Sequence, residues 1–341
     1  MDNRVGTALA LSLLSYFPEL SHGGYPDMGA FLDEYFSLPC SERPETMFSG
    51  LCADGVSGVV QAMKVLRKRK RFRDMKIVCD SSGSRRFNSF CALCPESRTA
   101  YIVIGGNYRV GFYRSGSGVT SSWCDNFLGA VQDVTAEQKD ILSFYDRAVS
   151  YAEGYRIVVC GHSKGGNLAQ YITLMRENAG ICFSFDGQGF SDTFIKNHRR
   201  QIQTYGGKIV SIYPGASIVG ASLIPIPTAK RYTVRERTVR RGVLYSHIPA
   251  ALFDRHLRLG KLSGSETFIQ KYVRRLSVRS IAAAQIIPFI SAESGLLHIG
   301  RALQYTFKDE PRRGLCELFD RDALLMLMLF LAELPLAVFG K

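Results

Sequence analysis

The chain has 341 residues, of which 46% are hydrophobic, 21% charged and 11% aromatic. This composition is that of a folded protein with a large core, and it excludes a disordered, collagen-like or disulfide-stapled chain. Lysine and arginine number 43 against 30 acidic residues, giving a net charge of +13. Such a charge favours contact with anionic surfaces, such as phospholipid or an acidic substrate, but it says nothing about the fold.

Residues 1–75 are predicted to be helical. The apolar stretch at residues 5–17 has the length of a signal peptide, but Asp2 offsets Arg4 before it and no small-x-small cleavage site follows. We therefore expect a buried or amphipathic first helix. The basic run at residues 64–73 has few interleaved aromatic residues, which argues against nucleic acid as a partner and favours a solvated face or contact with anionic lipid headgroups.

Short β-rich runs follow this helical region. Two of them, at residues 100–104 and 108–113, are separated by Gly105-Gly106-Asn107. This separation predicts a hairpin, because glycine and asparagine tolerate positive φ.

The cysteines are interpreted as packing residues. The lone C-x-x-C pair, Cys91 and Cys94, has no second pair at zinc spacing, and in a strand its side chains would point to opposite faces. Others lie inside apolar runs, where cysteine acts as a small hydrophobic residue. We therefore expect no metal site, and a reducing, cytoplasmic compartment.

Strand-like and helical segments alternate after residue 135. Thr135 and Gln138 have capping-box spacing at the start of a helical stretch. Strand-like runs then lie at residues 156–160, 182–185, 208–213 and 231–235, with a helix at 164–176. Strands separated by helix-length segments imply βαβ units and a mostly parallel central sheet flanked by helices.

The remainder of the chain is predicted to be helical. We expect an α/β core over residues 1–255, including the N-terminal helical segment, and a helical C-terminal extension over residues 256–341. The extension is interpreted as a lid or a cover of an acyl pocket, with packing against the core as the alternative. Within the extension, residues 323–340 approach membrane-spanning length, but Glu333 and Pro335 interrupt them. They are interpreted as a buried or membrane-surface helix.

The most informative segment runs from an apolar strand through Gly161-His162-Ser163-Lys164-Gly165 into a helix. This is a G-x-S-x-G nucleophile elbow, in which Ser163 sits on a turn too tight for side chains at the two glycines. A Gly-rich turn without chemistry is the alternative. His162 belongs to the elbow and is expected to point away from the Ser163 hydroxyl.

A serine nucleophile needs a base and an acid that follow it in the chain. His247 lies on a loop after the last predicted strand and is the candidate base, in preference to His198, His256 and His298. Asp186 directly follows a predicted strand and is the candidate acid, with Asp192 as the alternative and a structural turn as a further reading.

The predicted oxyanion hole has two backbone donors. One is the amide of Lys164, immediately after the nucleophile. The other is expected from the small residues Ser115 and Gly116, which follow an earlier strand.

These motifs together resemble lipase-like α/β-hydrolases related to class 3 lipases, and more closely an uncharacterised bacterial family of that superfamily. The family pattern has an R-G-T-type oxyanion loop, W-x-D-N-F, GHSKGGNLA, D-G-P-G-F, S-x-V-G and Q-H-x-P. The matching segments here, within residues 5–255, are Arg114-Ser115-Gly116, Trp123-Cys124-Asp125-Asn126-Phe127, the Ser163 elbow, Asp186-Gly187-Gln188-Gly189-Phe190, Ser217-Ile218-Val219-Gly220 and His247-Ile248-Pro249. This sequence departs from the pattern at Ser115, Gln188 and Ser246.

The resemblance implies an α/β-hydrolase fold and a cofactor-independent serine hydrolase that cleaves carboxylic esters, including acyl lipids. The same triad could transfer the acyl group to an alcohol or amine. The third interpretation is a catalytically inactive scaffold. Such a scaffold would bind a partner, or would bind a membrane as a peripheral protein.

Overall fold

The computed structural model describes residues 4–22, 24–39, 42–43, 53–82, 84, 87–106, 122–234, 247–253 and 257–275. The predicted strand at 108–113, the oxyanion candidates Ser115 and Gly116, and the helical extension beyond residue 275, with its apolar stretch at 323–340, lie outside these residues.

A mostly parallel sheet of eight strands forms the centre of the molecule, and its spatial order is the order of the chain. The strands are β1 (Lys76–Asp80), β2 (Ser89–Cys94), β3 (Thr99–Ile104), β4 (Arg156–His162), β5 (Ile181–Phe185), β6 (Ile209–Pro214), β7 (Lys230–Val234) and β8 (Leu262–Ser263). Strands β3 to β7 are parallel, while β1, β2 and β8 join antiparallel at the two edges. Strands β4 to β7 fall on the predicted runs.

The predicted hairpin at residues 105–107 is wrong for β3. Both edges of β3 are occupied, by β2 on one side and β4 on the other. Its antiparallel partner therefore precedes it in the chain, across the turn at residues 95–98, and β3 itself has no free edge. Gly105 is needed for a different reason, because a Cβ there would lie 2.3 Å from the carbonyl oxygen of Asn88, the residue just before β2.

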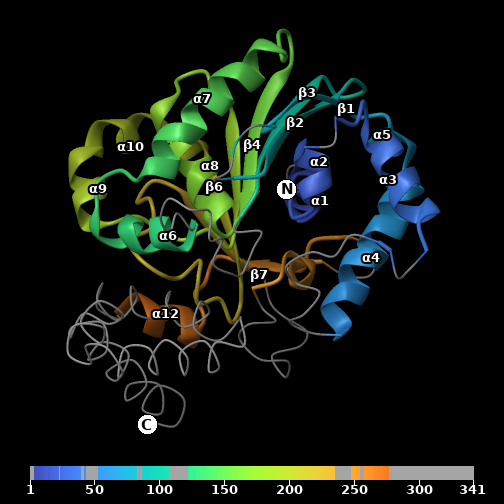
Figure 1. Ribbon diagram of the computed structural model, residues 1–341. Helices are drawn as coiled ribbons and strands as arrows, with labels where there is room; N and C mark the ends of the chain where they lie inside the picture. The colour runs from blue at the N-terminus through green and yellow to red at the C-terminus, as the bar shows by residue number, and fades with distance from the viewer. Residues whose placement is uncertain are drawn as a thin grey trace, which may run out of the picture.

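Helices cover both faces of the sheet (Figure 1). One layer holds α1 (Arg4–Leu14), α2 (Pro18–His22), α3 (Met28–Ser37), α4 (Ala53–Arg67) and α5 (Lys70–Arg73). The other holds α6 (Ser122–Val131), α7 (Ala136–Ser150), α8 (Lys164–Met175), α9 (Asp192–Asn197) and α10 (Arg199–Tyr205), followed by a short 3-10 turn, η1 (Gly206–Lys208). α7 begins with the predicted capping box of Thr135 and Gln138.

The core is split into two apolar clusters by the sheet, as the period-2 alternation of strands requires. Cys94 packs in the cluster under α1 and α3, while Cys91 packs in the cluster under α7 and α8. The C-x-x-C pair therefore points to opposite faces, as expected. Cys79, Cys91, Cys94, Cys160 and Cys182 are free thiols.

Helix α1 is buried on nearly all sides, which explains its almost continuous apolar sequence. It lies against β3 and β4. Tyr16, just beyond its last turn, is 1% exposed and reaches the carboxyl end of the sheet. Within the part of the chain that the structure describes, no helix combines the length and apolar character needed to cross a bilayer.

Two elements follow residue 255 in the described chain, β8 and α12 (Phe268–Arg275). α12 is fastened to the sheet through Gln270, whose amide nitrogen donates to the carbonyl of Pro214 at 2.9 Å and whose amide oxygen accepts from the hydroxyl of Thr233 at 3.0 Å. The sheet and its first C-terminal helix therefore extend past residue 255.

Candidate active site

Ser163 occupies the sharp turn between β4 and α8. Its φ of 57° is in the left-handed region, where a residue with a Cβ is strained. The flanking glycines permit the turn, because a Cβ on Gly161 would lie 2.4 Å from the carbonyl oxygen of Gly165, and one on Gly165 would lie 2.1 Å from that of Ile104. The turn thus has the strand–serine–helix geometry expected of a nucleophile elbow.

His247 lies beside this serine, although the two are far apart in the chain. Its Nε2 is 3.0 Å from the Ser163 hydroxyl oxygen, and its Nδ1 is 2.7 Å from Oδ2 of Asp186. A carboxylate can only accept, so Nδ1 carries the proton and Nε2 is left to accept from the serine hydroxyl. The structure thus brings together the three residues that the sequence singled out as nucleophile, base and acid.

Asp186 is fully buried and is held by the loop that follows β6. Its Oδ1 accepts from the hydroxyl of Ser217 and from the amide of Gly220 at 3.1 Å. Gly220 can have no side chain, because a Cβ would lie 2.4 Å from the same carboxylate oxygen. The S-x-V-G segment, which contains no acid, therefore supplies the hydrogen bonds that orient the acid on the neighbouring strand end.

His162 has a larger part in this site than the sequence indicated. Its predicted orientation away from the Ser163 hydroxyl stays a prediction, and its ring packs against that of His247, with 4.8 Å between the ring centroids. Its Nδ1 is 2.6 Å from the hydroxyl of Tyr16. The sequence gives no signal for this pair, because Tyr16 comes from the helical layer that precedes the sheet.

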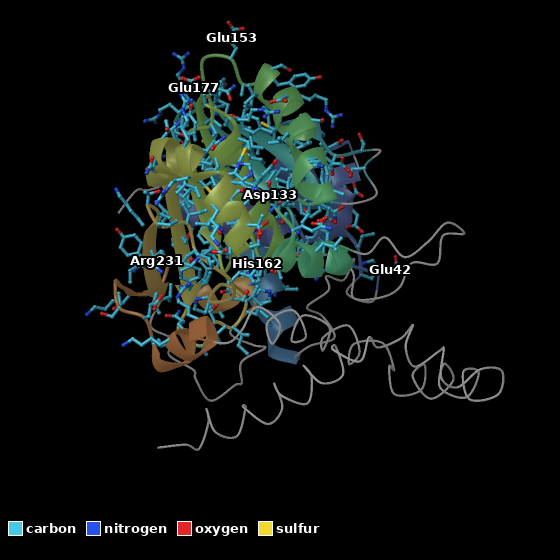
Figure 2. The ribbon with its side chains drawn as sticks, turned by 90° about the vertical axis from the view of Figure 1, so that its left-hand side faces the viewer. Glu42, Asp133, Glu153, His162, Glu177 and Arg231 are labelled. Carbon is cyan, nitrogen blue, oxygen red and sulfur yellow. The ribbon has the colours of Figure 1, made fainter. Side chains whose placement is uncertain are left out.

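The electrostatics of this pair keep both side chains neutral. Burial lowers the pKa of His162 well below its ordinary value, the adjacent His247 lowers it further, and a hydrogen bond with the His247 backbone acts in the opposite direction. Burial also raises the pKa of Tyr16, so its hydroxyl stays protonated and donates to the imidazole. Figure 2 places His162 at the end of the sheet opposite Glu153, which precedes β4.

The alternative candidates lie elsewhere. His198 is not simply solvated, because its Nε2 lies 3.1 Å from Asp133 and its ring packs on Phe194. Asp192 is the first residue of α9, whose N-cap is Ser191. His256 and His298 lie outside the described residues.

The donor atoms of His162, Asp186 and His247 lie within 4.8 Å of one another, a spacing that a metal ion could also use. Asp186 Oδ2 and His247 Nδ1 are hydrogen-bonded to each other. His162 Nδ1 is occupied by Tyr16. The donor set is therefore that of a hydrogen-bonded array around a serine.

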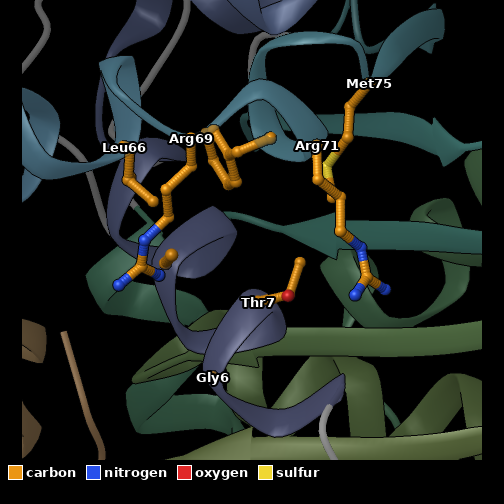
Figure 3. A pocket seen from close by; sticks show the side chains of 8 residues that line it. Gly6, Thr7, Leu66, Arg69, Arg71 and Met75 are labelled. Carbon is orange, nitrogen blue, oxygen red and sulfur yellow. The ribbon is translucent and has the colours of Figure 1, made fainter. Parts of the chain in front are cut away.

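A separate pocket of about 150 Å³ lies between α1 and the α4–α5 segment (Figure 3). Its lining combines apolar side chains such as Leu66 and Phe72 with Arg69 and Arg71. It is near the first turn of α1, whereas Tyr16 of the candidate site follows the last turn. The pocket therefore lies toward the N-terminal end of α1, and the serine site lies beyond the C-terminal end of this helix.

A mostly parallel sheet with a serine on the turn between a central strand and its following helix defines the α/β-hydrolase fold. A family profile described as Mbeg1-like matches residues 68–239, from the basic run to the end of β7 and slightly beyond. The chain therefore belongs to the Mbeg1-like family. A comparison with curated proteins finds no match.

Solved structures with a similar trace include lipases. The Rhizomucor miehei lipase–propeptide complex is 15% identical, with 76% of this chain and 82% of that chain covered and a TM-score of 0.41. A mutant form of MDLA from Penicillium cyclopium is 14% identical, with 70% and 81% covered and a TM-score of 0.41. A triacylglycerol lipase described as having a serine protease triad is 14% identical, with 76% and 95% covered and a TM-score of 0.41. Similarity at this level concerns the fold and not the substrate.

Proposed function

We propose that the protein is a serine hydrolase that cleaves carboxylic esters through an acyl-enzyme intermediate. The observation that carries the proposal is the continuous hydrogen-bonded path from Ser163 through His247 to Asp186, at 3.0 and 2.7 Å, beginning at a strained strand–helix turn. A serine hydroxyl is a weak nucleophile until an adjacent base removes its proton, and this path supplies that base.

In the proposed reaction Ser163 attacks the ester carbonyl while His247 takes its proton. The imidazolium then returns the proton to the leaving alcohol, and water repeats the sequence to release the acid. Asp186 stabilises the imidazolium and holds the tautomer that faces the serine. Its own orientation is supported by Ser217 and Gly220.

The negative oxygen of the tetrahedral intermediate requires backbone donors. Lys164 is the first residue of α8, so its amide has no partner within the helix and is available to an oxyanion. Ser115 or Gly116 is proposed as the second donor.

Labelling with a fluorophosphonate, together with turnover of p-nitrophenyl esters, tests this function. Ser163→Ala should abolish labelling and lower turnover by several orders of magnitude, because triad members act as a unit. His247→Ala should be about as damaging, whereas His198→Ala, which removes contacts with Asp133 and Phe194 and not with the triad, should leave turnover nearly unchanged. Asp186→Asn should lower kcat by roughly 10²–10⁴-fold.

The contrary results are equally specific. A folded wild-type protein that neither labels nor hydrolyses any ester would be an inactive scaffold. Turnover above about a tenth of wild type in Ser163→Ala would remove this serine as the nucleophile. Products formed with competing alcohols separate hydrolysis from acyl transfer.

We further propose that the substrate is an acyl lipid and that the protein contacts an anionic membrane from the cytoplasmic side. The support is the exposed basic segment at the end of α4 and in α5, where Lys64, Lys68 and Lys70 are all exposed. Basic residues near an anionic bilayer contribute about 1 kcal/mol each to binding.

A further inference from the structure

We infer that the buried ion pair between Lys164 and Asp125 is a positioning device, which holds the backbone amide of Lys164 in the direction needed to donate to the oxyanion. Lys164 follows the nucleophile directly, and Asp125 belongs to α6. The inference rests on the proposed ester hydrolysis and adds to it a pair of residues that do not touch the substrate.

The pair is short and almost completely enclosed. Lys164 Nζ lies 2.5 Å from Asp125 Oδ2, and the two side chains are 1% and 8% exposed. A second carboxylate, Glu137, is 4.0 Å from the same ammonium and 4% exposed. Lysine and acidic residues are rarely buried unless paired, so this ammonium can satisfy its charge only by keeping its present position.

Asp125 is itself fixed by the start of α7. Its Oδ2 also accepts from the hydroxyl of Thr135 at 2.7 Å, and its Oδ1 accepts from the amide of Glu137 at 3.1 Å. Thr135 is the N-cap of α7. The carboxylate is therefore anchored by two further donors from one helix terminus, and it presents a rigid acceptor to Lys164.

The same hydrogen-bond network continues from α7 to α8 and to the loop after β5. Gln138 of α7 donates to the side chain of Asn167 in α8 at 3.0 Å. Asn167 in turn donates to the carbonyl of Gly189, three residues after Asp186, at 2.9 Å. The first turn of α8 is thus tied to α6, to α7 and to the loop that carries the candidate acid.

These contacts affect the direction of the Lys164 backbone amide through the strained turn at Ser163. The positive φ of Ser163 persists only where surrounding contacts over-determine it. On the helix side the amides of Gly166 and Asn167 donate to its carbonyl, and the buried side chain of Lys164 fixes the residue that follows it. A buried ion pair contributes little net stability compared with apolar residues of the same volume. Its location one residue from the nucleophile therefore indicates positioning rather than stability as its main effect.

Asp125→Asn tests the pair with the smallest change in shape. We expect kcat for a p-nitrophenyl ester to fall by about 10–100-fold with KM within about threefold, because misplacing a catalytic group by about 1 Å has effects of this size. Affinity for a trifluoromethyl ketone, which forms an oxyanion on Ser163, should fall in proportion to kcat/KM. The pH profile should keep its wild-type midpoint, since Asp125 and Lys164 do not contact His247.

Asp146→Asn is the matched control. It removes the ion pair between Asp146 of α7 and Arg176 at the opposite end of α8, at 2.7 Å, and so loosens the same two helices away from the serine. Its kcat should stay within about twofold of wild type, although its thermal stability falls. Lys164→Gln and the double variant Lys164→Gln/Asp125→Asn complete a cycle in which the double variant should lose no more activity than either single variant.

The outcomes separate the inference from the proposed function. An active wild type with an unimpaired, folded Asp125→Asn variant would overturn the positioning pair alone, as would equal losses of kcat in Asp125→Asn and Asp146→Asn. Multiplicative losses in the double variant would also contradict it. A wild type without esterase activity or labelling would overturn the proposed function, and the positioning pair with it. If Lys164→Gln does not fold, the kcat of Asp125→Asn and its affinity for the ketone test the positioning role without it.

Discussion

At the scale of single residues, the position of one carboxylate depends on a neighbouring glycine. A Cβ at Gly220 would lie 2.4 Å from Oδ1 of Asp186 and 2.4 Å from the ring of Tyr213. Gly220→Ala should therefore push the carboxylate away from His247 and lower kcat by roughly 10–100-fold. Steady-state kinetics on a short ester measure this change.

Gly207→Ala is the control for that prediction, because nothing lies within 4 Å of a Cβ built there. It should leave both kcat and stability unchanged. Equal activity in the two variants would mean that the loop after β6 can move away without disturbing Asp186, and that the carboxylate does not depend on it.

His162 provides a prediction about pH. Burial lowers its pKa in the folded protein well below 6.5, whereas in the unfolded chain it titrates near that ordinary value. Below about pH 6.5 the unfolded state therefore binds a proton that the folded state does not. The free energy of unfolding then falls by up to about 1.4 kcal/mol for each unit by which the pH is lowered. Above about pH 6.5 the stability that the neutral His162 ring contributes is fully present.

Urea unfolding measured at several pH values between about 5 and 7.5 checks the sign and size of this effect. His162→Gln, which cannot titrate, should show a shallower decline over the same window, whatever its stability at neutral pH. Parallel curves for the two proteins would mean that other groups cause the acid sensitivity.

At the scale of secondary-structure elements, α7 depends on one hydroxyl. Thr135 accepts from the amide of Gln138 at 3.3 Å and donates to Asp125 at 2.7 Å. Thr135→Ala should lower the free energy of unfolding by about 1–2 kcal/mol, the range for losing an N-cap. Thr135→Ser retains both bonds and should lose less than half of that amount in denaturant titrations. Similar losses in both variants would point to the methyl group instead.

At the scale of the whole molecule, the basic segment and the candidate site belong to different parts of the fold. Lys68 precedes α5 and Lys70 begins it, and both are exposed, while α10 lies on the opposite side of the sheet (Figure 1). Lys68→Glu/Lys70→Glu should weaken sedimentation with phosphatidylglycerol vesicles by at least about tenfold, and added salt should weaken it in the wild type.

The double variant Arg199→Glu/Arg200→Glu makes the same change of net charge on α10 and serves as its control. It should retain most of the vesicle binding. If both pairs weaken binding equally, then net charge rather than a particular face governs the contact, and the membrane contact proposed for the basic segment is wrong.

Local chemistry accounts for what the sequence determined by itself. The Ser163 turn, the capping box at Thr135 and the opposite faces of Cys91 and Cys94 depend on steric limits and periodicities that act over a few residues. Chain order and the strand-end rule also selected Asp186 and His247, because carboxyl ends of neighbouring parallel strands meet at one edge of a sheet. The mostly parallel sheet followed from the same alternation.

Only the tertiary structure decided the contacts between residues distant in the chain. The antiparallel partner of β3 is β2 rather than a later strand, because strand pairing depends on which edges are filled and not on a turn signal alone. Tyr16 meets His162, and Lys164 meets Asp125, across separate elements of the fold. No local pattern encodes such pairs, since each side chain would be equally stable in water, and only burial in a common interior makes each require the other.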